Sequence, residues 1–156
     1  MIAGTITGPS LHVSASAEIG AAAVNVYRMI ADYRTGHQRM IPPQYFRNLE
    51  VDVGGYGAGT QIRYDLRAFG TTRHARARIS EPEPGRVLVE TDLTKGAVTT
   101  FTVDSLGGRR SLVTISTELP IRRGVIGAIE RAMTRRFLRK VYAAELARLD
   151  EQVRIS

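Results

Sequence analysis

The sequence predicts an α+β fold in which a curled antiparallel sheet of about seven strands is covered by two short helices and a long C-terminal helix. Two observations lead to this prediction. Short segments rich in Val, Thr, Ile and Tyr recur between residues 45 and 119, and a helical pattern of apolar residues then runs from 121 to 153. Because a straight helix cannot fill a strongly curled sheet, we expect a cavity between the two.

The first elements are a strand and two short helices. Residues 11–19, LHVSASAEI, alternate apolar and polar side chains, which is typical of a strand. Within residues 20–33, Val26 and Ile30 lie four apart, with other apolar residues at helical offsets, so we expect a helix that packs on one side. Residues 34–43 leave room for a second short helix, which two prolines end.

Six further strands follow at short and regular spacing, and we expect hairpins to join them. The segments between them include GGYGAG, EPEPG, TKG and GGRR, which are turn signals. The six strand segments are FRNLEVDV, TQIRYDLRAF, TRHARARIS, RVLVETDL, VTTFTVDSL and SLVTISTEL.

The most glycine-rich segment, VDVGGYGAGTQIRY at 51–64, could be a phosphate-binding loop or a tight turn. A dinucleotide-binding loop leads into a helix, and a P-loop carries Lys and then Ser or Thr after its last glycine. Here Gly59 is followed by strand alternation and by no lysine. We therefore predict a hairpin connection whose glycines permit positive φ angles.

The C-terminal segment, 121–153, predicts a long amphipathic helix. We expect its sheet-facing stripe to consist of Ile126, Ile129, Met133, Phe137, Val141 and Ala144. The solvent-facing side should carry Arg131, Arg135 and Arg139, flanked by Arg136 and Lys140, with Leu138, Tyr142, Leu146 and Leu149 roughly on the same side. Such a mixed face could contact an anionic membrane weakly, could contact a second copy of the chain, or could serve solubility alone.

Composition places the chain among ordinary globular domains. Its 156 residues are 43% hydrophobic and 24% charged, as expected for one soluble domain, here 11–153 after a loose segment 1–10. The absence of cysteine excludes disulfides and thiolate sites and fits a cytoplasmic location. We expect neither a secretory signal nor a transmembrane helix, because no basic start precedes an apolar block and no apolar run reaches about 18 residues.

The chain is strongly basic, with a formal net charge of +7. This balance permits binding to nucleic acid or anionic lipid and is also common on a plain solvated surface. Aromatic residues interleaved with arginine, which single-stranded nucleic acid requires, are sparse. We therefore expect no nucleic-acid partner.

Four segments carry a resemblance to a known family: EIGAAAVNVYRMIADY, GGYGAGTQIRY, RISEPEPGRVLVE and STELPIRRGVIGAIERAMTRRFLRKVYAAELARLDE. In this order, over about residues 11–152, they resemble the SRPBCC superfamily of helix-grip proteins. That superfamily includes START lipid-transfer domains, polyketide cyclase/dehydrase-like proteins and pollen-allergen-like proteins. The residues that match its opening helix and one of its turns are Val26, Tyr27, Ile30 and Asp32, and Glu81, Pro84 and Arg86.

Two features depart from the family pattern. Ala21-Ala22 stands where Ala-Pro is frequent, and the chain has no tryptophan, which is frequent near the second helix or the pocket. The resemblance implies a helix-grip fold and a ligand cavity. It does not imply a particular reaction, because this fold supports carriers, cyclases and subunits of larger enzymes.

Few side chains stand out as catalytic in the sequence. His12, His37 and His74 show no metal-ligand spacing, so we expect no metal site. Glu90 and Asp92 lie on the strand face opposite to the apolar residues of the same strand, so both carboxylates should point to solvent. No G-x-S-x-G motif indicates a nucleophilic serine.

Two further polar groups have open roles. Glu130 lies beside the apolar stripe of the C-terminal helix, where it could face the cavity with a raised pKa or pair with Arg122 or Arg123 at the edge of the stripe. On the fourth strand, basic side chains alternate with Ala75, Ala77 and Ile79 and should form an outer face. One arginine of the third and fourth strands could point inward and hold a ligand carboxylate, although the sequence does not indicate which.

We therefore expect the protein to bind or transport a hydrophobic or amphipathic small molecule, lipid-like or polyketide-like, without a cofactor. The alternative is a polyketide cyclase/aromatase-like enzyme that uses the same cavity. Such an enzyme would need several converging polar groups, and the sequence indicates few, which favours binding. The candidate ligand-binding residues are Tyr27, Tyr64, Leu66, Phe101, Val103, Ile126, Ile129, Glu130, Met133 and Phe137.

Overall fold

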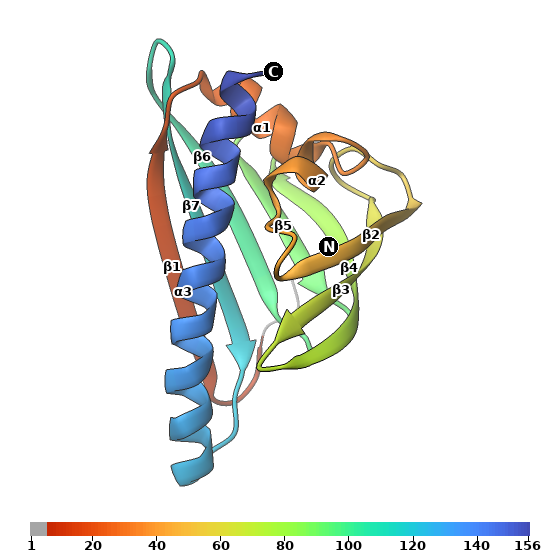
Figure 1. The fold of residues 1–156 in the computed structure, drawn as a ribbon, viewed down its shortest axis with the longest axis vertical. Coiled ribbons are helices and arrows are strands. Elements are labelled where there is room, and N and C mark those ends of the chain that lie inside the picture. The colour runs from red at the N-terminus through yellow and green to blue at the C-terminus, as the bar shows by residue number, and fades with distance from the viewer. Residues whose placement is uncertain (1–5) are drawn as a thin grey trace.

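The structure, a computed structural model, describes residues 6–156 and has the predicted order of elements (Figure 1). The strands are β1 (Ser10–Ile19), β2 (Phe46–Val53), β3 (Gln61–Ala68), β4 (Thr71–Glu83), β5 (Val87–Asp92), β6 (Val98–Gly107) and β7 (Arg110–Pro120). The helices are α1 (Ala23–Ala31), α2 (Gly36–Met40) and α3 (Gly124–Arg154). Half of the predicted loose segment, 1–5, lies outside the described residues.

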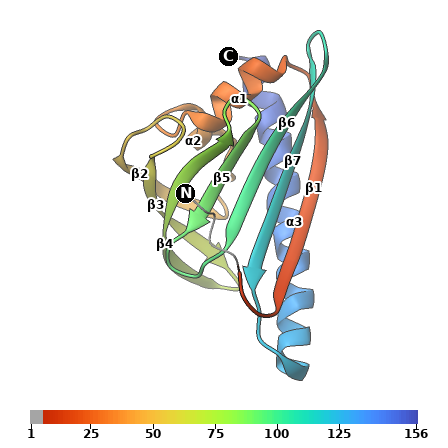
Figure 2. The ribbon, with the colours of Figure 1, turned by 180° about the vertical axis from the view of Figure 1, so that it is seen from behind.

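The sheet is antiparallel throughout, in the order β1-β7-β6-β5-β4-β3-β2. From β2 to β7 each strand pairs with the next one in sequence, and β1 pairs with β7 at one edge. Figures 1 and 2 show a curled sheet with α3 along its β1 side and with α1 and α2 at the end near the C-terminus. The predicted seven-stranded curled sheet with a long C-terminal helix is confirmed.

The core lies between the concave face of the sheet and the helices. Leu11 and Val13 on β1 are 2% exposed, and Val26 and Ile30 on α1 are completely buried. Their spacings of two and four place them on one side of a strand and of a helix. The one-sided burial predicted for these first two elements is therefore confirmed.

The glycine-rich segment is a hairpin connection between β2 and β3, as predicted, and all four of its glycines have positive φ angles. Gly57 also has no room for a side chain, because a Cβ atom there would collide with the Glu81 carboxylate. That carboxylate accepts hydrogen bonds from the Ala58 backbone N–H at 2.7 Å and from the Tyr27 hydroxyl at 2.6 Å. The loop is thereby fixed to α1 and β4.

The long helix α3 packs against the rest of the protein with its C-terminal half. The side chains buried there are Val141, Tyr142, Glu145, Leu146, Leu149 and Val153. The first turns project past the end of the sheet (Figures 1 and 2), and Ile126, Ile129 and Met133 are 62%, 57% and 49% exposed.

The predicted orientation of α3 is therefore wrong for its first turns and only partly right for its C-terminal half, where Phe137 and Val141 do face the sheet. Ile126, Ile129 and Met133 do not face the sheet, because no described strand or helix lies opposite the first turns. Tyr142 and Leu146, expected on the solvent side, are each only 4% exposed. No helix among residues 6–156 is both long enough and apolar enough to cross a membrane.

Candidate functional site

A cavity of about 220 Å³ lies between the concave face of the sheet, α2 and α3. Much of its wall is apolar, with aromatic side chains from β2, β6 and α3. The wall also has a polar part, to which the strands β3, β4 and β5 and the helices α2 and α3 contribute ionisable side chains. Its ionisable side chains are His37, Tyr64, Arg73, Glu90, Asp92, Tyr142 and Glu145.

The predicted ligand-binding residues separate into three groups in the structure. Tyr64, Leu66, Phe101 and Phe137 line the cavity. Tyr27 and Val103 are buried but do not line the cavity. The Tyr27 hydroxyl donates a hydrogen bond to Glu81 and is therefore not directed at a ligand. The remaining four, Ile126, Ile129, Glu130 and Met133, lie on the first turns of α3, away from the cavity. Glu130 does not face the cavity. It forms an ion pair with Arg122, in which Arg122 Nε and Glu130 Oε1 are 3.5 Å apart.

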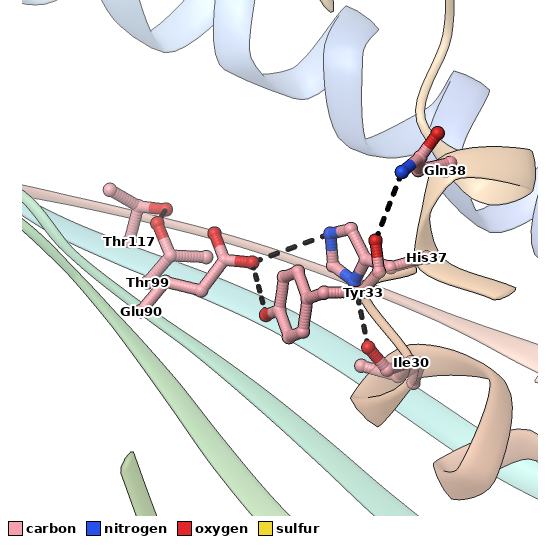
Figure 3. Close-up of polar contacts among 7 residues, drawn as sticks. All are labelled: Ile30, Tyr33, His37, Gln38, Glu90, Thr99 and Thr117. Carbon is pink, nitrogen blue, oxygen red and sulfur yellow. Dashed lines mark hydrogen bonds and ion pairs between the residues drawn. The ribbon is translucent and has the colours of Figure 1, made fainter. Parts of the chain in front are cut away.

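Tyr33, His37 and Glu90 form a buried cluster at the α2 end of the cavity (Figure 3). The Tyr33 hydroxyl donates to Glu90 Oε1 at 2.6 Å, and the Tyr33 ring stacks on the His37 ring with centroids 4.2 Å apart. His37 Nδ1 lies 2.8 Å from the carbonyl oxygen of Ile30. Because a carbonyl oxygen only accepts hydrogen bonds, Nδ1 must carry a proton.

The other ring nitrogen of His37 faces the Glu90 carboxyl group. His37 Nε2 and Glu90 Oε1 are 3.3 Å apart, and the two side chains are 4% and 16% exposed. This separation is that of an ion pair, which forms when the imidazole is protonated. An imidazole and a carboxyl group placed together beside a cavity are the kinds of group that act as a general acid or base.

The turn between α1 and α2 holds His37 in this position. The Asp32 carboxylate accepts hydrogen bonds from the backbone N–H groups of Arg34, Thr35 and Gly36, which closes the turn before α2. Acceptance of such N–H groups by a carboxylate is a common way to begin a helix. It places His37 in the first turn of α2, with its ring directed toward β5.

Arg73 and Asp92 form a second polar cluster on β4 and β5. Arg73 Nη2 donates to Asp92 Oδ2 at 3.0 Å, and Asp92 Oδ1 accepts the backbone N–H of Thr94 at 2.7 Å. The other terminal nitrogen, Nη1, is buried and has no hydrogen-bond partner among the described residues. An unsatisfied buried donor costs about 1–3 kcal/mol. A ligand with a carbonyl or carboxylate oxygen in the cavity would remove that cost.

Glu145 is a buried carboxyl group in the wall on α3, with 5% exposure. No hydrogen bond within residues 6–156 reaches its carboxyl group. Burial, and then the nearby Glu90 charge, raise the pKa of Glu145 well above its usual range. The protonated form of this side chain is therefore favoured, and in that form it can donate a hydrogen bond or a proton into the cavity.

Tyr142 and two threonines complete the polar wall. The Tyr142 hydroxyl is hydrogen-bonded to Thr117, whose hydroxyl lies 2.7 Å from that of Thr99 (Figure 3 shows the two threonines). Burial raises the pKa of Tyr142 well above its usual range, so its hydroxyl stays protonated. It can donate a hydrogen bond but cannot act as a base near neutral pH.

The structure corrects the prediction that Glu90 and Asp92 face solvent. Both line the cavity, on the face of β5 that also carries the completely buried Leu88. The error has a physical cause: β5 is the central strand of the sheet, and Val89 on its opposite face is also buried, at 7% exposure. Since both faces carry buried apolar residues, hydrophobic alternation does not identify the inner one.

The sequence does not indicate that Tyr33, His37 and Glu145 belong to one site. For His37 it offers only the question of a metal ligand. Within residues 6–156, no group of three or more His, Asp or Glu side chains could hold a metal ion. A signal did exist for Arg73, the inward arginine. It is two residues from Ala75, so it shares the buried face that the alternation of β4 predicts.

Fold and cavity together define the helix-grip class, in which a curled antiparallel sheet and a long C-terminal helix enclose a ligand-sized space. The chain belongs to the family described as "Polyketide cyclase / dehydrase and lipid transport", whose sequence model matches residues 10–154. The resemblance to the SRPBCC superfamily is thereby confirmed. No protein among the curated sequences matches the chain.

Solved structures with the same fold cover nearly the whole chain. The KanY protein shares 24% identity at a TM-score of 0.82, over 94% of this chain and 99% of its own. Zhui aromatase/cyclase from Streptomyces sp. R1128 shares 17% at a TM-score of 0.78, over 94% of both chains. Norcoclaurine synthase from Thalictrum flavum, in complex with dopamine and hydroxybenzaldehyde, shares 17% at a TM-score of 0.70, over 93% and 87%. At these identities the likeness is one of fold.

Proposed function

We propose that this protein is a polyketide cyclase-like enzyme that performs acid–base chemistry on a compact, carbonyl-containing aromatic or polyketide-like substrate. The observation that carries the proposal is the convergence of three polar units on one small cavity. These are the paired side chains of His37 and Glu90, the buried acid Glu145, and Arg73 with its unpartnered N–H. A passive carrier needs few such groups, and burying them costs stability.

The reaction that suits this wall is an intramolecular aldol condensation. Glu90, coupled to His37, removes a proton from the carbon next to one carbonyl group. The resulting enolate carbon forms a bond to a second carbonyl carbon, whose oxygen takes the proton of Glu145. In the loss of water that follows, Glu90 returns its proton to the departing hydroxyl group and Glu145 takes a proton from the adjacent carbon. Enolisation of the remaining carbonyl groups of the ring then makes it aromatic, with no oxidant or reductant needed. Arg73 Nη1 would hold a carbonyl or carboxylate oxygen and orient the chain.

Cavity size supports a compact substrate over a long lipid. At about 220 Å³, the space is smaller than the roughly 300–1,000 Å³ of pockets for drug-sized ligands. One or two rings fit such a space better than an acyl chain does. Norcoclaurine synthase, similar in fold, is bound to dopamine and hydroxybenzaldehyde, and Zhui is an aromatase/cyclase. Both similarities favour a compact aromatic or polyketide-like substrate for this protein.

Binding and transport of the same kind of ligand is the second candidate function. The apolar part of the wall, with Phe46, Phe101 and Phe137, favours it. Burial of aromatic rings against these side chains would supply affinity without any reaction. The two candidates differ in whether the polar wall is used for proton transfer.

Deuterium exchange at activated carbon atoms separates the two candidates. The protein in D₂O would be mixed with 2-tetralone or benzoylacetone, and NMR would follow both ligand binding and the loss of α-proton signals. The proposed enzyme accelerates exchange, and Glu90→Gln abolishes the acceleration while binding remains. Binding without accelerated exchange identifies a carrier. Absence of both with the two ketones contradicts the proposed substrate class.

A further inference from the structure

The first turns of α3 present an exposed apolar strip at the end of the molecule. Val125, Ile126, Ile129 and Met133 are 78%, 62%, 57% and 49% exposed. They are separated by one, three and four residues, so they lie along one side of the helix. Figures 1 and 2 show this end of α3 projecting beyond the sheet, where no other segment of residues 6–156 covers it. We call these four residues the apolar strip.

Positive charge is concentrated next to the apolar strip. Residues 122–140 contain seven basic side chains and one acidic one, a net charge of +6 out of the +7 of the whole chain. Five of the seven form a basic ridge on α3, consisting of Arg131, Arg135, Arg136, Arg139 and Lys140, with alanines between them. Within residues 6–156, no carboxylate forms an ion pair with any member of this ridge.

We propose that this end of α3 docks on an anionic membrane surface, with the apolar strip inserted at the headgroup boundary and the basic ridge on the lipid phosphates and carboxylates. Aliphatic side chains beside several basic residues are the composition of helices that bind such surfaces. Each basic residue near the surface adds about 1 kcal/mol of attraction. The proposal rests on α3 alone and holds for either function of the cavity.

Charge argues against a second copy of this chain as the partner. In a symmetric dimer the same patch meets itself, so two surfaces of net charge +6 would face each other. Single-stranded nucleic acid is a poor fit because the apolar strip contains no aromatic side chain for base stacking. An anionic membrane complements both the aliphatic and the basic part of the surface.

Docking in this way would bring the cavity close to the membrane. Phe137 follows Met133 by one helical turn and lines the cavity, where its ring contacts Phe69 at a centroid distance of 5.2 Å. Phe69 is 58% exposed, so this part of the cavity wall reaches the surface. An amphipathic ligand dissolved in the membrane would then meet the cavity within about one helical turn of the docked strip.

Vesicle co-sedimentation tests the proposal. The protein should co-sediment at low salt with vesicles that contain phosphatidylserine and phosphatidylcholine, and not with phosphatidylcholine alone. Added salt should release it, because exposed charges are screened. Loss of two basic residues in Arg135→Glu/Arg139→Glu should weaken binding at least about 30-fold. Ile126→Ser/Ile129→Ser should weaken binding and leave the salt dependence in place.

The matched control is Arg76→Glu/Arg109→Glu, which changes the net charge equally on β4 and on the β6–β7 turn. This control should bind like the wild type. No variant changes a buried position, so all melting temperatures should stay near the wild-type value. Absence of wild-type binding, or equal loss in the control, overturns the proposal. So does a wild-type dimer in light scattering that Ile126→Ser/Ile129→Ser converts to a monomer.

Discussion

At the scale of single residues, the buried carboxyl group of Glu145 is unfavourable for folding and is the acid of the proposed reaction. It sits in a wall where a Gln or Leu would cost less, because it lacks hydrogen-bond partners among the described residues. Burial, and then Glu90, raise its pKa well above the usual range. A group of this kind opposes folding once it is forced to ionise.

The pH dependence of stability should show this effect. Between the ordinary pKa of Glu, about 4.3, and the raised value, the folded state binds one proton more than the unfolded state. The contribution of Glu145 to stability is therefore fully present at low pH and falls by up to about 1.4 kcal/mol per pH unit across that window. Glu145→Gln has no proton to lose, so its stability relative to the wild type should rise with pH.

Urea unfolding of both proteins from pH 4 upward measures this difference. Glu151→Gln, an exposed position on the same helix, controls for the removal of one carboxylate. If the wild type and Glu145→Gln give parallel profiles, the carboxyl group of Glu145 ionises freely in the folded protein. It could then not serve as the buried acid of the proposed reaction.

At the scale of elements, the hairpin between β2 and β3 depends on contacts that its glycines make possible. Gly57 and Gly59 both have positive φ, at +62° and +88°. They differ in their surroundings, since a Cβ atom at Gly57 would collide with the Glu81 carboxylate and one at Gly59 would meet nothing within 4 Å. The two positions therefore separate backbone strain from the loss of the Glu81 contacts.

Substitution by alanine should destabilise the protein more at Gly57 than at Gly59. Gly59→Ala should cost about 1–2 kcal/mol, the strain of a Cβ atom in the left-handed region. Gly57→Ala should cost about 1–3 kcal/mol more, because Glu81 must leave the Ala58 N–H or the Tyr27 hydroxyl. Urea melts give both values, and equal losses would show that Glu81 does not anchor the loop.

The buried face of an element could be predicted from the sequence where its opposite face is exposed to solvent. It could not be predicted for a strand buried on both faces or for a helix that is packed along only half of its length. The strand β1 and helix α1 alternate between core and solvent, so their buried residues follow from spacing alone. β5 is central and buried on both faces, so its inward carboxylates could not be identified. α3 is free at one end and packed at the other, and no single apolar stripe describes both halves.

At the scale of the whole molecule, a curled sheet against a straight helix predicts a cavity but not which residues line it. Four of the ten predicted residues do so, because the line of closest approach lies along the C-terminal half of α3. The polar groups of the wall come from segments far apart in sequence, which include α2, β4, β5 and α3. No local motif joins them, so only the assembled fold shows that they meet.

The cavity itself can be tested by comparing two phenylalanines of its wall. Phe101 on β6 is 2% exposed, whereas Phe137 on α3 is only half-buried and contacts Tyr45 and the exposed Phe69. Phe101→Ala should therefore cost about 3–5 kcal/mol, as in a packed core. Phe137→Ala should cost clearly less, because water can reach the space that it leaves.

The same variants should differ in how they bind an apolar dye whose fluorescence rises out of water. The wild type should bind the dye in the cavity, and Phe137→Ala should change the affinity because it enlarges that space. Urea melts together with dye titrations measure both effects. If Phe137→Ala loses as much stability as Phe101→Ala and the wild type binds no dye, then α3 closes on a filled core. Neither catalysis nor transport could then take place between this helix and the sheet.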